Sequence, residues 1–131
     1  MRAFIDATIA EARTRGYVTT VLGRRRYLPE LGAVDPAVRQ FAERAATNTP
    51  IQGSAADLIK LAMLAVPRRL AEAGVGGRLL LQVHDELLLE VPDASVEQAV
   101  DCVRSAMETV WPLRVPLRVD VHHGASWAEA H

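Results

Sequence analysis

Two adjacent carboxylates, Asp85 and Glu86, stand between two largely apolar stretches, 78–83 and 87–91, that have the length and composition of β-strands. A two-residue hairpin turn favours Asn-Gly or Asp-Gly, because its central residues need positive φ angles. This turn has two acids and no glycine, and such departures from local rules are typical of functional sites. A divalent cation at the tip would relieve the repulsion, and oxygen ligands favour Mg²⁺ or Mn²⁺ over zinc. A solvated acidic turn is the alternative.

The same hairpin predicts the neighbours of the two carboxylates. With both acids in the turn, His84 faces Leu87 across the strands and Gln82 faces Leu89. Alternation along the strand then places Gln82 and His84 on one face of the hairpin. A single histidine beside a strand end is more often structural than a ligand. His122-His123 is a second candidate metal pair, but adjacent strand residues point to opposite faces, so we expect it to be structural or exposed.

The elements before this hairpin are predicted from periodicity and from helix and turn signals. Apolar residues at helical spacing predict a helix that ends at Gly16, followed by a small hairpin formed by 17–21 and 24–28. A second helix begins at Asp35-Pro36, with Asp as the cap and Pro at the first helical position. We expect it to end near Thr47, because Pro50 disfavours a helical backbone at the preceding residue, Thr49.

The remaining elements complete an α+β pattern. Residues 51–66 predict a helix that is apolar nearly all round, the kind that is buried within something larger, with an interruption or kink at Pro67. After the acidic hairpin, Ser95-Val-Glu-Gln98 predicts a capping box that opens another helix, and 116–122 predicts a closing strand. Helices followed by hairpins in this order predict an α+β fold with an antiparallel sheet.

Composition bounds the class of protein. The chain has 131 residues, one cysteine and a net charge of −1, so we expect one domain or a piece of a larger one, without an internal disulfide. No apolar run reaches the ~18 residues of a membrane helix, and the start lacks a signal-peptide core, so we expect an intracellular protein without a membrane partner. Residues 1–70 carry a net charge of +5 and 71–131 one of −6, which is compatible with one face for phosphates and another for cations.

Three ordered motifs resemble family A DNA polymerases, the bacterial DNA polymerase I type. They are Leu22-Gly-Arg-Arg-Arg-Tyr-Leu-Pro29, Glu43-Arg-Ala-Ala-Thr-Asn-Thr-Pro-Ile-Gln-Gly-Ser-Ala-Ala-Asp-Leu-Ile-Lys60 and Gln82-Val-His-Asp-Glu-Leu87, and the likeness continues to Trp127. The resemblance implies the C-terminal portion of a polymerase domain. Residues 1–55 would end the fingers subdomain, and 56–131 would form the C-terminal palm, an antiparallel sheet with a carboxylate-tipped β-hairpin packed on helices.

The resemblance also implies roles for individual residues. Asp85 would be the catalytic, metal-binding carboxylate and Glu86 its supporting neighbour. The residues implied to contact primer–template DNA are Arg24, Arg25, Arg26, Arg44, Asn48, Gln52 and His84. Helix capping and turn formation around Pro50 are the alternative for Asn48 and Gln52, and a solvated charge run is the alternative for the three consecutive arginines.

The implied function is templated DNA synthesis in replication and repair by a DNA-directed DNA polymerase in the bacterial cytoplasm, associated with the nucleoid. Its partners would be primer–template DNA, dNTP and the remainder of the polymerase chain, with Mg²⁺ as cofactor and Mn²⁺ as the alternative. The family's first palm motif and its nucleotide-binding fingers helix do not occur here. Two-metal phosphoryl transfer needs both ions held, so we expect these 131 residues alone to be inactive. A non-catalytic DNA-binding fragment and a metal-dependent phosphoesterase are the alternatives.

Overall fold

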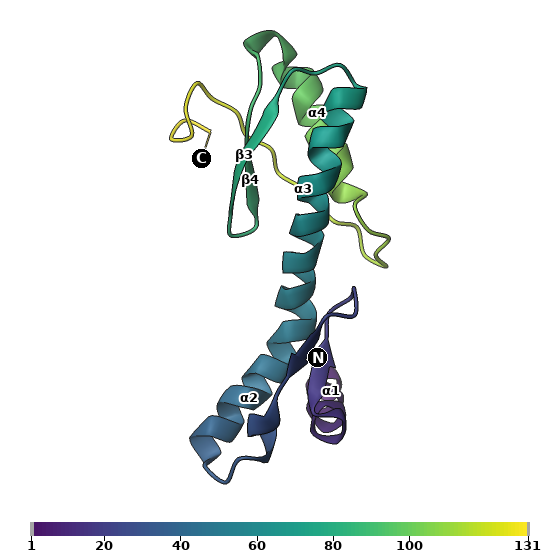
Figure 1. The fold of residues 1–131 in the computed structure, drawn as a ribbon, viewed down its shortest axis with the longest axis vertical. Coiled ribbons are helices and arrows are strands. Elements are labelled where there is room, and N and C mark those ends of the chain that lie inside the picture. The colour runs from purple at the N-terminus through teal and green to yellow at the C-terminus, as the bar shows by residue number, and fades with distance from the viewer. Residues whose placement is uncertain (1, 131) are drawn as a thin grey trace. The chain divides into compact units, whose positions relative to one another are not determined.

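The computed structural model describes residues 2–130 and combines helices with two small antiparallel sheets (Figure 1). This arrangement confirms the predicted α+β class. The chain divides into two compact units, Met1–Asp57 and Leu58–His131, close to the predicted division after residue 55. The assignment of these units to fingers and palm stays a prediction. None of the helices in the described part of the chain is long and apolar enough to cross a membrane.

The first unit consists of helices around a small hairpin, near the positions predicted from the sequence. The first helix ends where Gly16 takes a positive φ of 77°, a conformation that glycine adopts without steric cost. Asp35 caps the second helix by accepting a hydrogen bond from the Ala37 N–H at 2.8 Å. The elements are α1 (Arg2–Arg15), β1 (Tyr17–Thr19), β2 (Arg25–Tyr27), η1 (Pro29–Gly32), α2 (Pro36–Asn48) and η2 (Thr49–Gly53).

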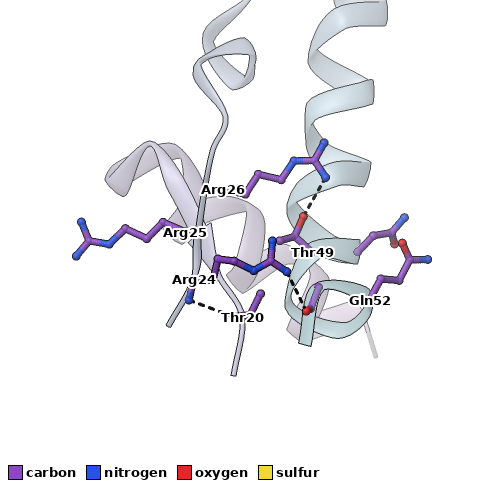
Figure 2. Close-up of a pocket in the computed structure, with 8 residues that line it drawn as sticks. Thr20, Arg24, Arg25, Arg26, Thr49 and Gln52 are labelled. Atoms are coloured by element: carbon purple, nitrogen blue, oxygen red, sulfur yellow. Dashed lines mark hydrogen bonds between the residues drawn. The ribbon is translucent and has the colours of Figure 1, made fainter. Parts of the chain in front are cut away.

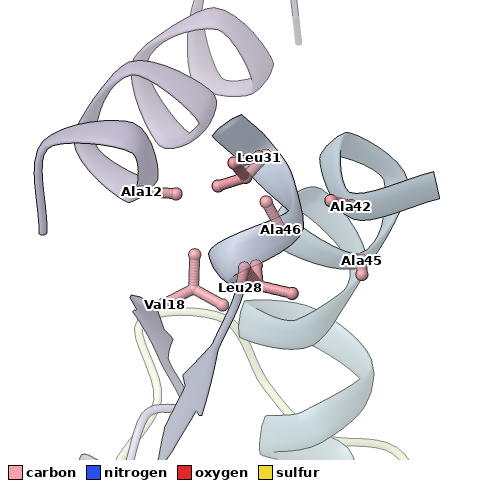
Figure 3. Packing of buried hydrophobic residues seen from close by; sticks show 7 residues of the cluster. All are labelled: Ala12, Val18, Leu28, Leu31, Ala42, Ala45 and Ala46. Atoms are coloured by element: carbon pink, nitrogen blue, oxygen red, sulfur yellow. The ribbon is translucent and has the colours of Figure 1, made fainter. Parts of the chain in front are cut away.

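Small apolar side chains form the core of the first unit (Figure 3). Helix α1 contributes a single fully buried residue, Ala12, and α2 contributes three alanines, so the helices can approach closely. Larger side chains from the hairpin and from η1 fill the space beside them. The cluster comprises Ala12, Val18, Leu28, Leu31, Ala42, Ala45 and Ala46.

Helix α2 ends at Asn48, within one residue of the predicted end, but the predicted reason is wrong, because the helical backbone continues through Pro50. Thr49 has φ −60° and ψ −43°, well within the helical region, and a π-helical turn, η2, leads directly into the next helix. Proline lacks an N–H and its ring collides with the carbonyl four residues earlier in an α-helix. A π turn is wider, with bonds from residue i to i+5, and it makes room for the ring. The Thr49 hydroxyl donates to the Ala45 carbonyl at 2.7 Å.

The second unit is built from helices and the acidic hairpin. Helix α3 begins within the first unit and runs through Pro67, so the predicted interruption there is wrong. Val66 and Leu70, on either side of this proline, are almost completely buried, and their packing compensates for the lost backbone hydrogen bond. The elements are α3 (Ser54–Glu72), β3 (Arg78–Val83), β4 (Glu86–Glu90), η3 (Asp93–Ser95) and α4 (Val96–Glu108).

The core of the second unit lies between α3, α4 and the hairpin. Val66, Leu70 and Val75 pack with the buried stripe of α4, which is Ala99, Val103 and Ala106. Partly buried residues of β4 and the segment after it, Leu87, Leu89 and Val91, pack against this cluster and fix the hairpin to the helices. Helix α3 is not buried all round, because 69% of Leu64 is exposed.

Two local predictions in the second unit are wrong. Ser95 occupies the N-cap position of α4 but its side chain makes no capping hydrogen bond, because its φ of −113° and ψ of 5° lie outside the extended region that a cap requires. Gln98 instead donates to the Ala73 carbonyl at 3.2 Å. Residues 116–122 join neither of the two sheets that the described chain contains. An alternating sequence specifies faces but supplies no partner strand.

Replacing Leu70 by alanine should lower the free energy of unfolding of the 131-residue chain by about 2–5 kcal/mol, because it opens a cavity in the core of the second unit. Leu64→Ala is the matched control on the same helix and should change it by less than about 0.5 kcal/mol. Urea unfolding measures both. Equal losses for the two variants would contradict the described packing of α3.

Candidate nucleic-acid interface and metal-binding hairpin

The turn of the acidic hairpin lies one residue earlier than predicted. Val83 pairs with Glu86 and Gln82 with Leu87, so the two turn residues are His84 and Asp85. The predicted pairings of His84 with Leu87 and of Gln82 with Leu89 are therefore wrong. Glu86 belongs to β4 and not to the turn, because its backbone joins the strand ladder.

A β-bulge interrupts the pairing of the two strands. The pairing shifts between Leu79 and Leu81, so one additional residue of β3 lies opposite the ladder of β4. Strict alternation would place Leu81 on the same face as Leu79, but it fails at the bulge, and 40% of Leu81 is exposed. Strand β3 ends at Val83 and His84 belongs to the turn, so the prediction that His84 shares a strand face with Gln82 is wrong.

His84 holds the turn in an unusual backbone conformation. It is the sole non-glycine residue between 2 and 130 with a positive φ, which is 52°. Few non-glycine residues adopt this region, although histidine does so more often than most. The side-chain amide of Gln82 donates to the His84 carbonyl at 2.5 Å and supports the turn. The sequence predicts poor turn chemistry here, and the structure places the strain at His84.

The two carboxylates lie at the exposed end of this hairpin. Asp85 is in the turn and Glu86 is the first residue of β4. Trp127 lines a small pocket of about 30 Å³ with Val83, Glu86 and the two leucines that follow. Between residues 2 and 130, no three His, Cys, Asp or Glu side chains come together as a metal cluster. The oxygen donors of Asp85 and Glu86 suit Mg²⁺ or Mn²⁺, but they fit such an ion only as part of a larger ligand set.

A polar cleft of about 370 Å³ gathers five of the predicted DNA-contacting residues in the first unit (Figure 2). These five are the three consecutive arginines, Asn48 and Gln52. Arg44 is exposed on α2 but does not line the cleft, and His84 lies on the hairpin of the second unit. The lining residues are Thr20, Arg24, Arg25, Arg26, Asn48, Thr49, Gln52 and Gly53.

The three arginines have different environments. Arg24 donates from Nε to Asp57 Oδ1 at 2.7 Å, and Arg26 donates to the Thr49 hydroxyl at 3.3 Å. The Arg25 guanidinium lies 4.7 Å from the centre of the Tyr17 ring and points away from the other two (Figure 2). Alternation along this short strand explains the division. All three side chains are exposed, as the alternative of a solvated charge run also expects, but each has a partner within the first unit.

The exposed Arg25 guanidinium lies beside two tyrosine side chains. Hydrogen bonding to the side chain of Tyr27, and to a lesser extent the charge interaction with Tyr17, raises the pKa of the Arg25 guanidinium above its usual value. The rings of these two tyrosines meet edge to face, with centres 5.6 Å apart, across the β1–β2 ladder. Arg25 is thus a fixed cation on the outer side of the hairpin.

The capping alternative for Asn48 finds no support. Asn48 makes no side-chain capping hydrogen bond at the start of η2. Gln52 lies within the same π turn with an exposed side chain, and the turn depends on Pro50 and the Thr49 hydroxyl instead. Both side chains are therefore available to a ligand in the cleft.

Sequence reasoning missed the residues beneath the cleft. Asp57, Thr20 and Thr49 are the buried polar side chains of the described chain, each 7% exposed or less. Asp57 accepts from the Thr20 hydroxyl at 2.5 Å and from Arg24. The available signal was Asp57 as the single acid of the largely apolar stretch 51–66. Its partners, however, lie more than thirty residues earlier, where no local pattern predicts them.

Comparison with known proteins identifies the family. A sequence profile of DNA polymerase family A matches residues 1–129. The chain belongs to DNA polymerase family A. This confirms the predicted resemblance and places the QVHDEL hairpin and the arginine cleft in a family A chain.

Relatives of the family A chain match it over almost its whole length. It is 53% identical over 130 residues to the thermostable DNA polymerase I of Thermus caldophilus and 52% identical to DNA polymerase I of Geobacillus stearothermophilus. Each match covers 99% of this chain and 15% of the relative, so the chain spans about 15% of the length of these curated relatives. A solved structure, the POL domain of Pol1 from M. smegmatis in complex with DNA primer-template and dNTP, is 51% identical with a TM-score of 0.92, covering 98% of this chain and 23% of that one.

Substitution of His84 tests the strained turn. His84→Gly should leave the free energy of unfolding unchanged or raise it by up to about 1 kcal/mol, because glycine adopts a positive φ without steric cost. His84→Val should lower it by about 1 kcal/mol or more, since a β-branched residue is a clear outlier in this region. Denaturant unfolding of the 131-residue chain compares them. A valine variant as stable as the glycine variant would show that the turn is not strained.

Proposed function

We propose that this chain is the part of a DNA-directed DNA polymerase that supplies a metal-binding carboxylate hairpin and contacts to primer–template DNA. The observation that carries the proposal is the match, at 51% identity and a TM-score of 0.92, to a polymerase domain described in complex with DNA primer-template and dNTP. The reaction would be templated nucleotidyl transfer, in which the primer 3′-hydroxyl attacks a dNTP and pyrophosphate leaves. Residues 1–55 would belong to the fingers and 56–131 to the palm, acting in the bacterial cytoplasm on nucleoid DNA in replication and repair.

In this proposal, the Asp85 carboxylate is the principal metal ligand and Glu86 supports it. Bound Mg²⁺, or Mn²⁺, would activate the primer hydroxyl and stabilise charge on the leaving group. The exposed position of Asp85 at the end of a hairpin that is packed on α3 and α4 suits this role. Further ligands and the nucleotide-binding helix would come from the remainder of the polymerase chain. The 131 residues alone should therefore extend no primer.

The cleft of the first unit would bind the DNA backbone and its minor groove. Arg24 and Arg26 have planar guanidinium groups that suit phosphate oxygens. Gln52, with His84 from the hairpin, would donate hydrogen bonds to the minor groove, where every correct base pair presents an acceptor at a similar place. Asn48 and the exposed Arg44 would add contacts along the same helix. Such contacts sense the shape of a base pair without reading its sequence.

Asp85→Asn in the intact polymerase tests the metal role. It should lower kcat for primer extension by about 100-fold or more, because it keeps the shape but removes charge that contributes several kcal/mol to the transition state. The Kd for primer–template should stay close to that of the unmodified enzyme. Single-turnover extension and a DNA-binding titration measure the two quantities.

Two further variants control this experiment. Asp93→Asn makes the same change at an exposed acid outside the hairpin and should leave kcat unchanged. Glu86→Gln should reduce kcat less than Asp85→Asn does. A larger effect at Glu86 would reverse the assigned roles, and full activity of Asp85→Asn would refute the proposed metal site.

Gln52→Ala and His84→Ala should change the handling of mismatches more than correct incorporation. Each lost hydrogen bond contributes about 0.5–1.5 kcal/mol, so the ratio of matched to mismatched primer extension should shrink about 2- to 13-fold. Gln40→Ala, an exposed glutamine on the same helix α2 as Asn48, is the matched control. A lowered melting temperature with an unchanged ratio would show that Gln52 and His84 are structural only.

A further inference from the structure

The buried polar side chains of residues 2–130 are concentrated beneath the cleft. Asp57 accepts hydrogen bonds from Thr20 and Arg24, and the Thr49 hydroxyl donates to the Ala45 carbonyl. Thr49 also accepts a hydrogen bond from Arg26 (Figure 2). Burying a carboxylate is costly unless it is paired and hydrogen-bonded. Apolar residues would have packed α3 against the hairpin equally well. The polar set therefore serves a purpose other than packing.

This set fastens the turn of the β1–β2 hairpin to the beginning of α3. Arg24 also donates to the Gly53 carbonyl at 3.2 Å, its backbone N–H donates to the Thr20 hydroxyl at 3.1 Å, and the Val21 N–H donates to the Ser54 hydroxyl at 2.8 Å. The two segments lie so close that a Cβ on Gly53 would come within 2.9 Å of the Thr20 methyl group. The turn has little room to move relative to the helix.

The same contacts orient the Arg24 guanidinium. Two of its five N–H groups are engaged, one by Asp57 and one by the Gly53 carbonyl. The side chain is nevertheless 58% exposed and lines the cleft, so the guanidinium remains accessible to a ligand there. An arginine fixed in this way loses less freedom when it binds a phosphate than one that is free in solution.

We propose that Asp57 is a positioning residue for DNA binding: with Thr20, it holds Arg24 in the orientation in which the guanidinium contacts a backbone phosphate. The inference rests on the proposed function and extends it to a buried carboxylate that would not itself touch DNA. Thr20 completes the arrangement, because its hydroxyl links Asp57 Oδ2 to the Arg24 backbone.

An argument from charge alone predicts the opposite change in DNA affinity, so the two explanations can be distinguished by experiment. A carboxylate beside a phosphate-binding cleft repels DNA, so neutralising Asp57 would by itself raise DNA affinity. If Asp57 positions Arg24, neutralising it lowers affinity, because the arginine must then be ordered at each binding event. The sign of the change in Kd therefore decides between the two.

The experiment compares Asp57→Asn and Thr20→Val in the intact polymerase, measuring the Kd for primer–template, kcat and the melting temperature. Both variants should raise Kd by about 2- to 13-fold, the cost of ordering one long side chain, with kcat at saturating DNA unchanged. Thr20→Val alters no charge and preserves shape, so it remains informative if Asp57→Asn folds poorly. Arg13→Gln breaks a 2.6 Å ion pair with Glu43 between α1 and α2, away from the cleft, and should leave Kd unchanged.

A double variant tests whether Asp57 acts through Arg24. In the background of Arg24→Gln, which itself weakens binding, Asp57→Asn should cause no further rise in Kd. The proposal is overturned if Asp57→Asn and Thr20→Val lower only the melting temperature, or if Asp57→Asn lowers Kd. Absence of primer extension by the unmodified polymerase would instead refute the proposed function, and the Kd comparison would still report on Asp57.

Discussion

A buried charge imposes the constraint on which the cleft depends. Asp57 is 7% exposed, and a carboxylate in that position is stable only if donors reach it from nearby. Thr20 and Arg24 are those donors, so the turn that carries them must lie against the first turn of α3. The strand that follows this turn is thereby also positioned, with Arg26 opposite Thr49. The shape of the cleft is thus a consequence of the hydrogen bonds that one buried carboxylate requires.

The acidic hairpin depends on a different principle, since apolar packing positions it. Leu87, Leu89 and Val91 hold its second strand against the core formed by α3 and α4, while the tip stays exposed. The unfavourable features, two adjacent acids and a positive φ at His84, are confined to residues outside this packing. A rigid base and a strained, charged tip suit a group that must be presented to a ligand.

Local signals predicted much of the fold. Gly16, with a positive φ, ends the first helix where the sequence indicates, and Asp35 caps the second helix as predicted. Motif resemblance predicted the family and five residues that share the cleft.

The wrong predictions have their cause in tertiary contacts and in backbone geometry that the residue types do not encode. Pro50 and Pro67 are tolerated because a wider turn and buried neighbours compensate, which neither local rule anticipates. The hairpin register depends on a bulge near Leu80 that the run of leucines conceals. The role of Asp57 could not be predicted locally, because its hydrogen-bond partners are distant in the sequence. Residues 116–122 lack a partner strand in the described chain.

The π turn at Thr49–Gly53 makes the number of residues before Asp57 as important as their identity. A π turn contains about one residue more than a turn of α-helix, so loss of one residue there would remove the wider turn that accommodates the ring of Pro50. Each residue of an α-helix advances the side-chain direction by about 100°, so loss of one residue between Ser54 and Asp57 would turn the Asp57 carboxylate away from Thr20 and Arg24. Natural length variation should therefore be absent between Ala45 and Asp57, while the exposed connection at Val34, before the capping residue Asp35, should accept it.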